Sequence, residues 1–249
     1  MRWEDFQKKF RVMVIAHRGA CYEAPGNTLL AFEKAVEAGA EMIEFDVHKT
    51  SDNHIVVIHD KTTKRTSEIN INVHNSTLQE VKEIPLKQDL RIPTLEEVFK
   101  KFKGKLYFQI EIKQREIAPL ILSLIDQYDV HDQCLISSFW HKELHYFKKS
   151  EKKLLLSSLE PTLIHYPIRK LLRKWMVRNT INSGFDGLHP NYELVTPDLV
   201  SYAHSNNLYV LPWTADHSQD WQYMLDCNVD GIMTNYPREL VHFLSKQNI

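Results

Sequence analysis

The chain has 249 residues, with 31 lysines and arginines against 32 aspartates and glutamates, so its formal net charge is −1. Hydrophobic residues make up 43% and charged residues 25%, which is typical of a folded globular protein and excludes a disordered one. A nucleic-acid-binding domain normally carries a basic excess, so the near-neutral charge argues against that class. No run approaches the roughly 18 consecutive apolar residues of a membrane-spanning helix.

The first residues and the cysteines favour a cytoplasmic protein. Met1 to Asp5 lack the basic start and apolar core of a secretory signal. Cys21, Cys134 and Cys227 are widely spaced and odd in number, which suits reduced thiols better than a disulfide framework. The sequence does not indicate an oligomeric state.

Short apolar runs alternate with amphipathic helical patterns along the chain, which is typical of βα units around a parallel sheet. The predicted strands cover 12–17, 42–47, 106–113, 134–139, 153–159, 185–191, 208–214 and 229–234. The predicted helices cover 28–38, 94–102, 116–128, 141–149, 163–180 and 218–226, with two more beginning at 196 and 237. Eight such pairs in about 250 residues predict a single α/β domain over 1–249, a TIM (β/α)8 barrel.

Several helix boundaries carry specific signals. Asn27 or Thr28 is placed to cap the first helix, and Gly39 to end it. Thr94 with Glu97 forms a capping box at the start of the second.

One β-like run, 55–60, does not fit the eightfold count. We interpret 50–91 as a short insertion after the second strand, beginning with a turn at Asp52 and Asn53. An insertion at that end of a barrel strand usually helps to build the active site.

Charged residues occupy one face of two predicted strands. Glu44 and Asp46 share a face of the second strand, and Glu111 and Lys113 share a face of the third. The outward face of a barrel strand is buried under helices, so these side chains must point into the barrel mouth. Three converging carboxylates repel one another without a cation. Oxygen ligands favour Mg²⁺ or Ca²⁺ over zinc. A lone Glu-x-Asp pair is more often ion-paired than metal-binding, and only the joint placement favours a site.

Two histidines lie near the same place. His17 ends the first strand and is followed by Arg18, while His59 lies on the insertion. Histidines titrate near neutrality and serve as general acids and bases, although a single barrel-mouth histidine is more often structural. No G-x-G pair or phosphate-binding glycine loop occurs, so phosphate chemistry here must use side chains or a metal.

Ordered motifs over about 14–237 resemble the glycerophosphodiester phosphodiesterase family. Each motif is weak alone, but the full set in order is specific. The first group is His17-Arg18-Gly19, Pro25-Gly26-Asn27-Thr28, Ala31-Phe32, Gly39-Ala40, Ile43-Glu44-Phe45-Asp46-Val47 and Val56-Val57-Ile58-His59-Asp60. The later group is Ile110-Glu111-Ile112-Lys113, Ser138-Phe139, Trp213-Thr214 and Asp230-Gly231-Ile232-Met233-Thr234-Asn235-Tyr236-Pro237.

The resemblance implies a TIM barrel that uses a divalent metal, Mg²⁺ or Ca²⁺. It implies that Glu44, Asp46 and Glu111 bind the metal, that His17 and His59 are the acid–base pair, and that Arg18 and Lys113 bind the phosphate. The sequence does not decide which histidine is the acid.

Two positions depart from the family pattern. The family usually has Pro-Glu-Asn-Thr where this chain has Gly26 in place of the glutamate, and Glu23 lies near enough in sequence to replace that carboxylate. The usual Lys-Asp-Gly turn becomes Ser51-Asp52-Asn53, which asparagine can satisfy because it tolerates positive φ.

The leading hypothesis is a phosphoric diester hydrolase that releases glycerol 3-phosphate and an alcohol from glycerophosphodiesters. One alternative is a lysophospholipase D acting on lysophospholipids. Another, suggested only by Gly26, is a catalytically weakened barrel that binds a phosphorylated ligand. Trp213 ends the seventh strand and either lines the substrate pocket or is a core aromatic. The basic helix over 163–180 is more often an outer barrel helix than a membrane-surface element.

Overall fold

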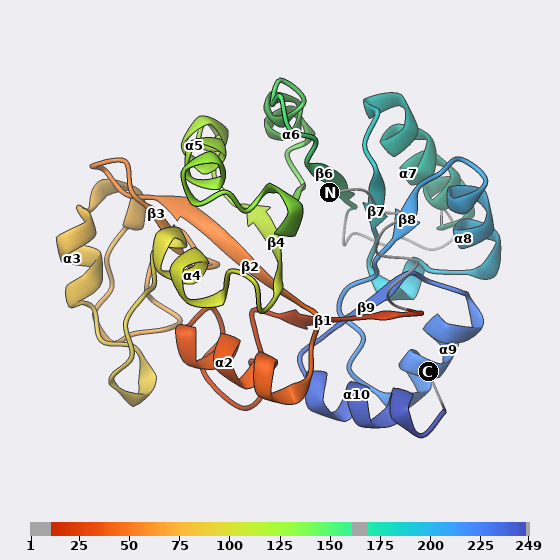
Figure 1. Ribbon diagram of the computed structural model, residues 1–249, viewed down its shortest axis with the longest axis horizontal. Helices are drawn as coiled ribbons and strands as arrows, with labels where there is room; N and C mark the ends of the chain where they lie inside the picture. Colours follow the sequence, from red (N-terminus) through yellow and green to blue (C-terminus); the bar gives the residue numbers. More distant parts are fainter. Residues whose placement is uncertain (1–10, 161–168, 248–249) are drawn as a thin grey trace.

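Parallel strands alternate with helices in the computed structural model, which describes residues 11–160 and 169–247 (Figure 1). Within these ranges the barrel strands are β1 (Met13–His17), β2 (Met42–Lys49), β4 (Tyr107–Ile112), β5 (Cys134–Ser138), β6 (Leu155–Leu159), β7 (Gly187–His189), β8 (Tyr209–Val210) and β9 (Gly231–Thr234). The helices are α2 (Leu29–Ala38), α3 (Leu78–Glu83), α4 (Leu95–Phe102), α5 (Ala118–Tyr128), α6 (His141–Phe147), α7 (Arg169–Ser183), α8 (Pro197–His204), α9 (Ser218–Asp226) and α10 (Pro237–Ser245).

The sheet curves into a nearly closed barrel. Its strand order is β8-β7-β6-β5-β4-β2-β1-β9, and all neighbours on this path pair in parallel. Backbone bonds join the two ends, from Asp230 N to Val210 O (3.1 Å) and from Met233 N to Pro212 O (3.1 Å). The predicted TIM-barrel fold is therefore confirmed.

Two predicted strands are much shorter than their apolar runs. The run 185–191 yields only β7, and the run 208–214 yields only β8. Each run contains a proline, Pro190 or Pro212, whose nitrogen carries no hydrogen for a ladder bond. The chain stays in place beyond them, because Trp213 N donates to Pro190 O at 3.0 Å.

The predicted helix boundaries are confirmed where the sequence gives a capping signal. Thr28 caps α2 through a bond from Ala31 N, and Gly39 ends it with φ 84°. The Thr94 and Glu97 capping box is formed at the start of α4. The first part of the predicted 163–180 helix lies outside the described residues, and the remainder is α7.

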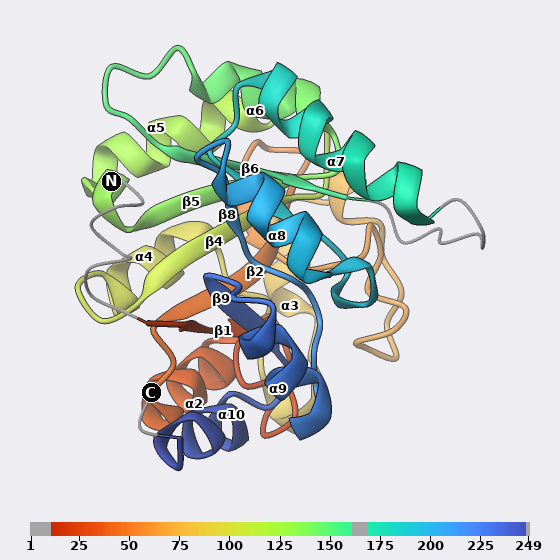
Figure 2. The ribbon, with the colours of Figure 1, turned by 90° about the vertical axis from the view of Figure 1, so that its right-hand side faces the viewer.

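The run at 55–60 belongs to the insertion and is not a ninth barrel strand. β3 (Ile55–Val57) pairs antiparallel with the end of β2, after a turn in which Asn53 has φ 67°. The following insertion holds η1 (Val73–Asn75), α3 and η2 (Lys87–Asp89), and packs around a small apolar cluster of its own. This hairpin carries His59 back to the C-terminal ends of the barrel strands, on the right of Figure 2.

Side chains on the central strands alternate between the helix-facing layer and the barrel interior. Phe108 is buried on the outer side, with its ring centroid 5.3 Å from that of Phe99 on α4 and 6.4 Å from that of Phe45 on β2. Gln109 and Glu111 take the opposite face of β4, as the sequence predicts. The apolar layer therefore fixes the direction in which the acidic residues point.

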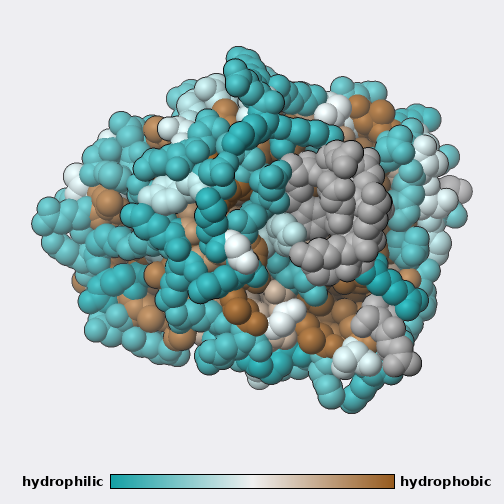
Figure 3. Space-filling model, viewed as in Figure 1, coloured by the Kyte–Doolittle hydropathy of each residue, from teal (hydrophilic) through white to brown (hydrophobic). Residues whose placement is uncertain are grey.

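No helix among the described residues is long and apolar enough to cross a membrane. The three cysteines are free thiols. The surface in Figure 3 is covered mainly by hydrophilic residues, with hydrophobic ones scattered among them. Large exposed apolar side chains do occur on α7, where Leu171 is 73% and Trp175 is 53% exposed.

Replacing Phe108 by alanine should destabilise the barrel by about 3–5 kcal/mol, because a buried aromatic is lost and a cavity is left. Tyr223→Ala on α9, where the side chain is exposed, should cost much less. Urea unfolding followed by circular dichroism measures both. Equal losses in the two variants would contradict the assignment of Phe108 to the layer that holds β4 in place.

Candidate active site

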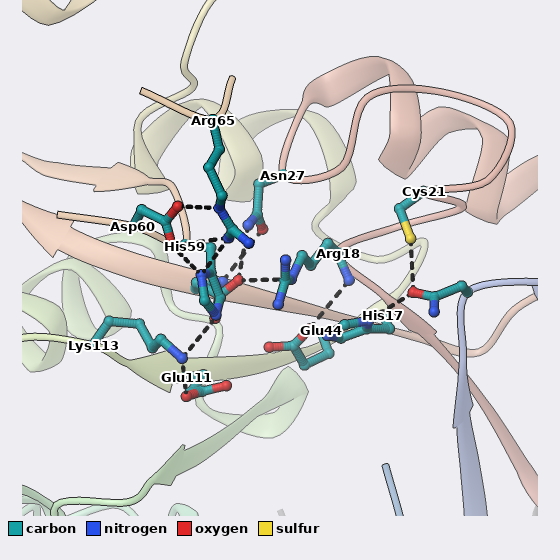
Figure 4. Close-up of polar contacts among 12 residues, drawn as sticks. His17, Arg18, Cys21, Asn27, Glu44, His59, Asp60, Arg65, Glu111 and Lys113 are labelled. Atoms are coloured by element: carbon teal, nitrogen blue, oxygen red, sulfur yellow. Dashed lines mark hydrogen bonds and ion pairs between the residues drawn. The ribbon is translucent and has the colours of Figure 1, made fainter. Parts of the chain in front are cut away.

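Polar side chains gather at the C-terminal ends of β1, β2 and β4, where the insertion returns to the barrel (Figure 4). The strand register explains this gathering. His17 pairs with Glu44 across β1 and β2, and Asp46 pairs with Glu111 across β2 and β4. Parallel neighbours in register present their same-face side chains at one level of the barrel.

Glu44, Asp46 and Glu111 converge in the barrel mouth. Each offers a carboxylate oxygen, and these oxygens lie within 4.8 Å of one another. Glu44 and Asp46 are each only 1% exposed. Glu44 Oε1 and Asp46 Oδ1 are buried without a hydrogen-bond partner among the described residues. Buried, unsatisfied carboxylate oxygens at this spacing fit a hard divalent cation such as Mg²⁺ or Ca²⁺.

Burial and mutual repulsion raise the pKa values of these acids, and the neighbouring cations lower them. Burial, and then the charges of Asp46 and Glu111, raise the pKa of Glu44 well above its usual value. Burial and the charge of Asp46 raise the pKa of Glu111 to about 7. Burial alone would raise the pKa of Asp46 as well, but nearby Arg18 and Lys113 outweigh it and hold that pKa below its usual value. Asp46 is therefore the most acidic member of the cluster.

Two cations flank the acids. Arg18 Nε lies 3.3 Å from Asp46 Oδ2, and Lys113 Nζ lies 2.8 Å from Glu111 Oε1 and 3.5 Å from Asp46 Oδ1. The Arg18 backbone is also fixed, since its N–H donates to Glu44 Oε2 at 3.1 Å and its φ is 56°. Gly19 permits this turn, because a Cβ there would lie 2.7 Å from the Ala31 backbone.

The ring of His17 is oriented by a chain of polar groups. His17 Nδ1 lies 2.7 Å from Asn235 Oδ1, and the Asn235 amide donates to Asp216 Oδ2 at 2.6 Å. An amide oxygen can only accept, so Nδ1 carries the hydrogen and Nε2 faces the acids, 3.9 Å from Glu44 Oε2. Burial first, and then Arg18, lower the pKa of His17 to about 4.

The ring of His59 is oriented by a carboxylate. His59 Nδ1 lies 2.6 Å from Asp60 Oδ1, and Arg65 binds the same carboxylate. The backbone oxygen of His59 accepts from His48 Nε2 at 3.1 Å. Burial lowers the pKa of His59, and Arg18 and Lys113 act in the same direction. Figure 4 shows His59 on the opposite side of Arg18 from His17, so two imidazoles border one site.

A small cavity of about 180 Å³ lies over these groups. Its lining includes His17, Glu44, His59, Glu111, Lys113 and Trp213. Trp213 is held by a bond from its Nε1 to His189 O at 2.9 Å, and its ring meets the edge of Phe139 at 5.8 Å. Trp213 therefore lies against the site and not in the core. All the predicted site residues are thus brought to one mouth of the barrel.

Sequence reasoning assigned the residues that position this site no part in it, and placed Asn27 only as a candidate helix cap. Asn27 donates to Asp46 Oδ2 at 2.8 Å, while Asn235 and Asp60 hold the two histidines. All three belong to the family-like motifs of the sequence, and membership of those motifs could have marked them as site residues. Asp216 and Arg65 lie outside the quoted motifs, and no sequence signal marked them.

The prediction that Glu23 replaces the missing family carboxylate is wrong. Both Glu23 oxygens accept from Arg238, each at 3.0 Å. At Gly26 itself, a Cβ would lie 3.0 Å from Cys21 Cβ and 3.1 Å from Arg18 Cβ. The surroundings of Gly26 therefore leave little room for a larger side chain, and the Glu23 carboxylate is bound by Arg238. The altered turn is tolerated as predicted, since Asn53 adopts positive φ.

The barrel and its acidic, histidine-containing mouth define a TIM-barrel protein equipped for phosphate ester chemistry. Residues 17–239 match the model of the glycerophosphoryl diester phosphodiesterase family. A glycerophosphodiester phosphodiesterase of Caldanaerobacter subterraneus subsp. tengcongensis is 34% identical, over 95% of this chain and 99% of the relative. The chain therefore belongs to the glycerophosphoryl diester phosphodiesterase family and is a phosphoric diester hydrolase.

Two further proteins are similar to this chain. A mouse protein named lysophospholipase D is 25% identical, over 96% of this chain and 88% of its own length. A phosphodiesterase of Oleispira antarctica, solved in complex with the product sn-glycerol-3-phosphate, has the same fold. Its TM-score is 0.82 at 22% identity, covering 94% of this chain and 96% of that one.

Metal-induced stabilisation should depend on pH in a defined direction. Glu111 binds its proton more tightly in the folded than in the unfolded chain, so without metal the free energy of unfolding falls as pH rises from 4.5 to about 7. Mg²⁺ or Ca²⁺ competes with that proton and should raise the melting temperature more at about pH 8 than at about pH 5.

Differential scanning fluorimetry with and without each cation measures this dependence. In Glu111→Gln, which has no proton to lose, both the fall with pH and the response to metal should shrink. A metal response that is the same at both pH values in the unmodified protein would contradict the cluster as the binding site.

Proposed function

We propose that this enzyme hydrolyses glycerophosphodiesters to glycerol 3-phosphate and an alcohol with a divalent metal and two histidines. The observation that carries the proposal is the buried set of unsatisfied carboxylate oxygens on Glu44 and Asp46, within reach of Glu111. Two imidazoles with free Nε2 atoms border the same cavity of about 180 Å³. The name of the bacterial relative supports the same reaction.

The charged groups match the needs of a phosphodiester. A divalent cation held by the three carboxylates would supply electrostatic stabilisation of the charge that develops on the phosphoryl oxygens. Arg18 and Lys113 lie beside the cluster and can bind the remaining non-bridging oxygens. The three acids and two cations nearly balance, which leaves a net positive site once a dication is bound.

The histidines carry the proton transfers. One Nε2 takes a proton from the attacking hydroxyl and the other returns one to the leaving alcohol, a contribution of roughly 10²–10⁴-fold in rate. Asn235 and Asp60 keep each ring in the tautomer that leaves Nε2 free. The attacking hydroxyl is that of water or of the neighbouring glycerol carbon. The free thiols suit a cytoplasmic enzyme, and we extend the proposal to that compartment.

Removing either histidine should abolish turnover without unfolding the protein. His17→Ala and His59→Ala are assayed by release of glycerol 3-phosphate and free alcohol, and folding is followed by circular dichroism. His242→Ala, at an exposed position on α10, is the matched control. EDTA should stop the reaction, and Mg²⁺ or Ca²⁺ should restore it. Activity near the unmodified level in either site variant would refute the acid–base pair. No release from any substrate by the unmodified protein would favour the weakened, ligand-binding barrel.

A second candidate activity is that of a lysophospholipase D. The observation that favours it is a set of exposed apolar side chains on segments that follow barrel strands in the chain, namely Tyr22, Ile69 and Phe139 on loops and Leu171 and Trp175 on α7. An acyl chain or a membrane surface could cover such residues. The mouse relative carries the name of this activity.

A double variant tests the lipid candidate. Leu171→Ser with Trp175→Ser should lower release of choline from lysophosphatidylcholine several-fold and weaken co-sedimentation with anionic liposomes, because apolar contact area is lost. Release from glycerophosphocholine should be unchanged. Tyr223→Ser, an exposed aromatic on α9, is the control. If the double variant treats both substrates as the unmodified protein does, α7 has no part in lipid binding.

A further inference from the structure

A second cavity, of about 580 Å³, opens beside the catalytic centre. We call it the basic cavity, and its lining residues include Lys61, His74, Lys113, Arg115, Glu116 and Trp140. Lys113 lines both this cavity and the smaller one over the acids. Lys113 therefore adjoins both the proposed phosphate position and the basic cavity.

The cations of the basic cavity are not all neutralised. Lys113 is paired with Glu111 and Asp46. In contrast, neither Lys61 nor Arg115 forms an ion pair with any residue that the structure describes. Glu116 is the single carboxylate among the described lining residues. The cavity therefore keeps an excess of positive charge next to the place where a phosphodiester binds.

Fixed groups shape this cavity. The Arg115 guanidinium lies over the Trp140 ring, 5.7 Å from its centroid, and this contact uses the ring face that could otherwise hold a ligand cation. Gln114 is held from both sides, because its Oε1 accepts from Lys49 N at 3.0 Å and its Nε2 lies 2.9 Å from His74 Nδ1. These contacts position Arg115 and Gln114, and the side chains of Lys61 and Arg115 are both exposed.

A third cavity, which His59 lines, has a different character. It measures about 350 Å³ and is lined by Arg18 and Arg65, together with apolar residues of the insertion such as Leu86 and Ile92. Both of its arginines are paired, Arg18 with Asp46 and Arg65 with Asp60. A negatively charged group gains more from the basic cavity, where Lys61 and Arg115 lack acidic partners among the described residues.

We propose that the basic cavity binds a negatively charged group on the leaving alcohol, so that the enzyme prefers glycerophosphodiesters whose alcohol carries a second phosphate. The proposal rests on the function proposed above and names its substrate class. Glycerol lies toward Trp213 and Phe139, and the alcohol passes Lys113 to reach Lys61 and Arg115. A choline group would meet like charge there and is the disfavoured alcohol.

A pair of substrates that differ by one phosphate tests the preference. Purified enzyme with metal is assayed on glycerophosphoinositol 4-phosphate and on glycerophosphoinositol, with release of glycerol 3-phosphate as the readout. The phosphorylated substrate should have a kcat/KM about tenfold higher, and the advantage should shrink as salt rises. Equal values for the two substrates would overturn the proposal.

Charge variants locate the effect. Lys61→Gln with Arg115→Gln should remove the advantage of the phosphorylated substrate and leave kcat/KM for glycerophosphoinositol within about twofold. Arg115→Lys keeps the charge and should retain most of the advantage. Lys64→Gln, an exposed lysine of the same insertion outside the cavity, is the matched control. An equal fall for both substrates in the double variant would refute the cavity as a charge-selective site.

A binding experiment separates this proposal from the function on which it rests. Calorimetric titration of the unmodified protein and the double variant with inositol 4-phosphate should give binding that the variant weakens about tenfold. If neither diester is hydrolysed but this binding is present, the proposed function fails and the anion site remains. If both diesters are hydrolysed and no binding difference is found, the anion site fails alone.

Discussion

The site depends on the repulsion between carboxylates that the barrel forces together. Glu44 and Asp46 are buried almost completely, and Glu111 faces them from the next strand. Arg18 and Lys113 compensate only part of this charge, since Glu44 Oε1 and Asp46 Oδ1 remain without hydrogen-bond donors among the described residues. The folded chain therefore stores an electrostatic cost that a divalent cation can relieve.

The two residues that orient the histidine rings are themselves fixed by further polar contacts. Asn235 orients His17 and is fixed by Asp216, whereas Asp60 orients His59 and is bound by Arg65. The group that contacts Nδ1 is an amide oxygen for His17 and a carboxylate for His59. A carboxylate stabilises an imidazolium more than an amide does, so the two rings have unlike environments although they border one site.

Sequence patterns predicted most of the fold and named the residues that the structure gathers at the barrel mouth, but few of the residues that position them. The alternation of Phe45 with Glu44 and Asp46 shows which face of β2 is apolar, because outward barrel positions must pack under helices. Hydrophobicity alone predicted longer strands at 185–191 and 208–214 than the structure contains, and Pro190 and Pro212 account for the difference. Asp216 is linked to the His17 ring through its hydrogen bond with Asn235, which lies 19 residues away in the chain. Contacts between residues so far apart in the sequence leave no local sequence pattern.

The sequence by itself determined the barrel, the acidic strand faces and the presence of two histidines near them, since period-two alternation and chain length constrain all three. Only the tertiary structure decided that Glu23 is engaged by Arg238 and that Lys61 and Arg115 share a cavity with Lys113. Which charged surface residues pair with each other depends on the distances between loops that are far apart in the sequence. Those distances follow from how the insertion folds back onto β2 and not from the spacing of residues.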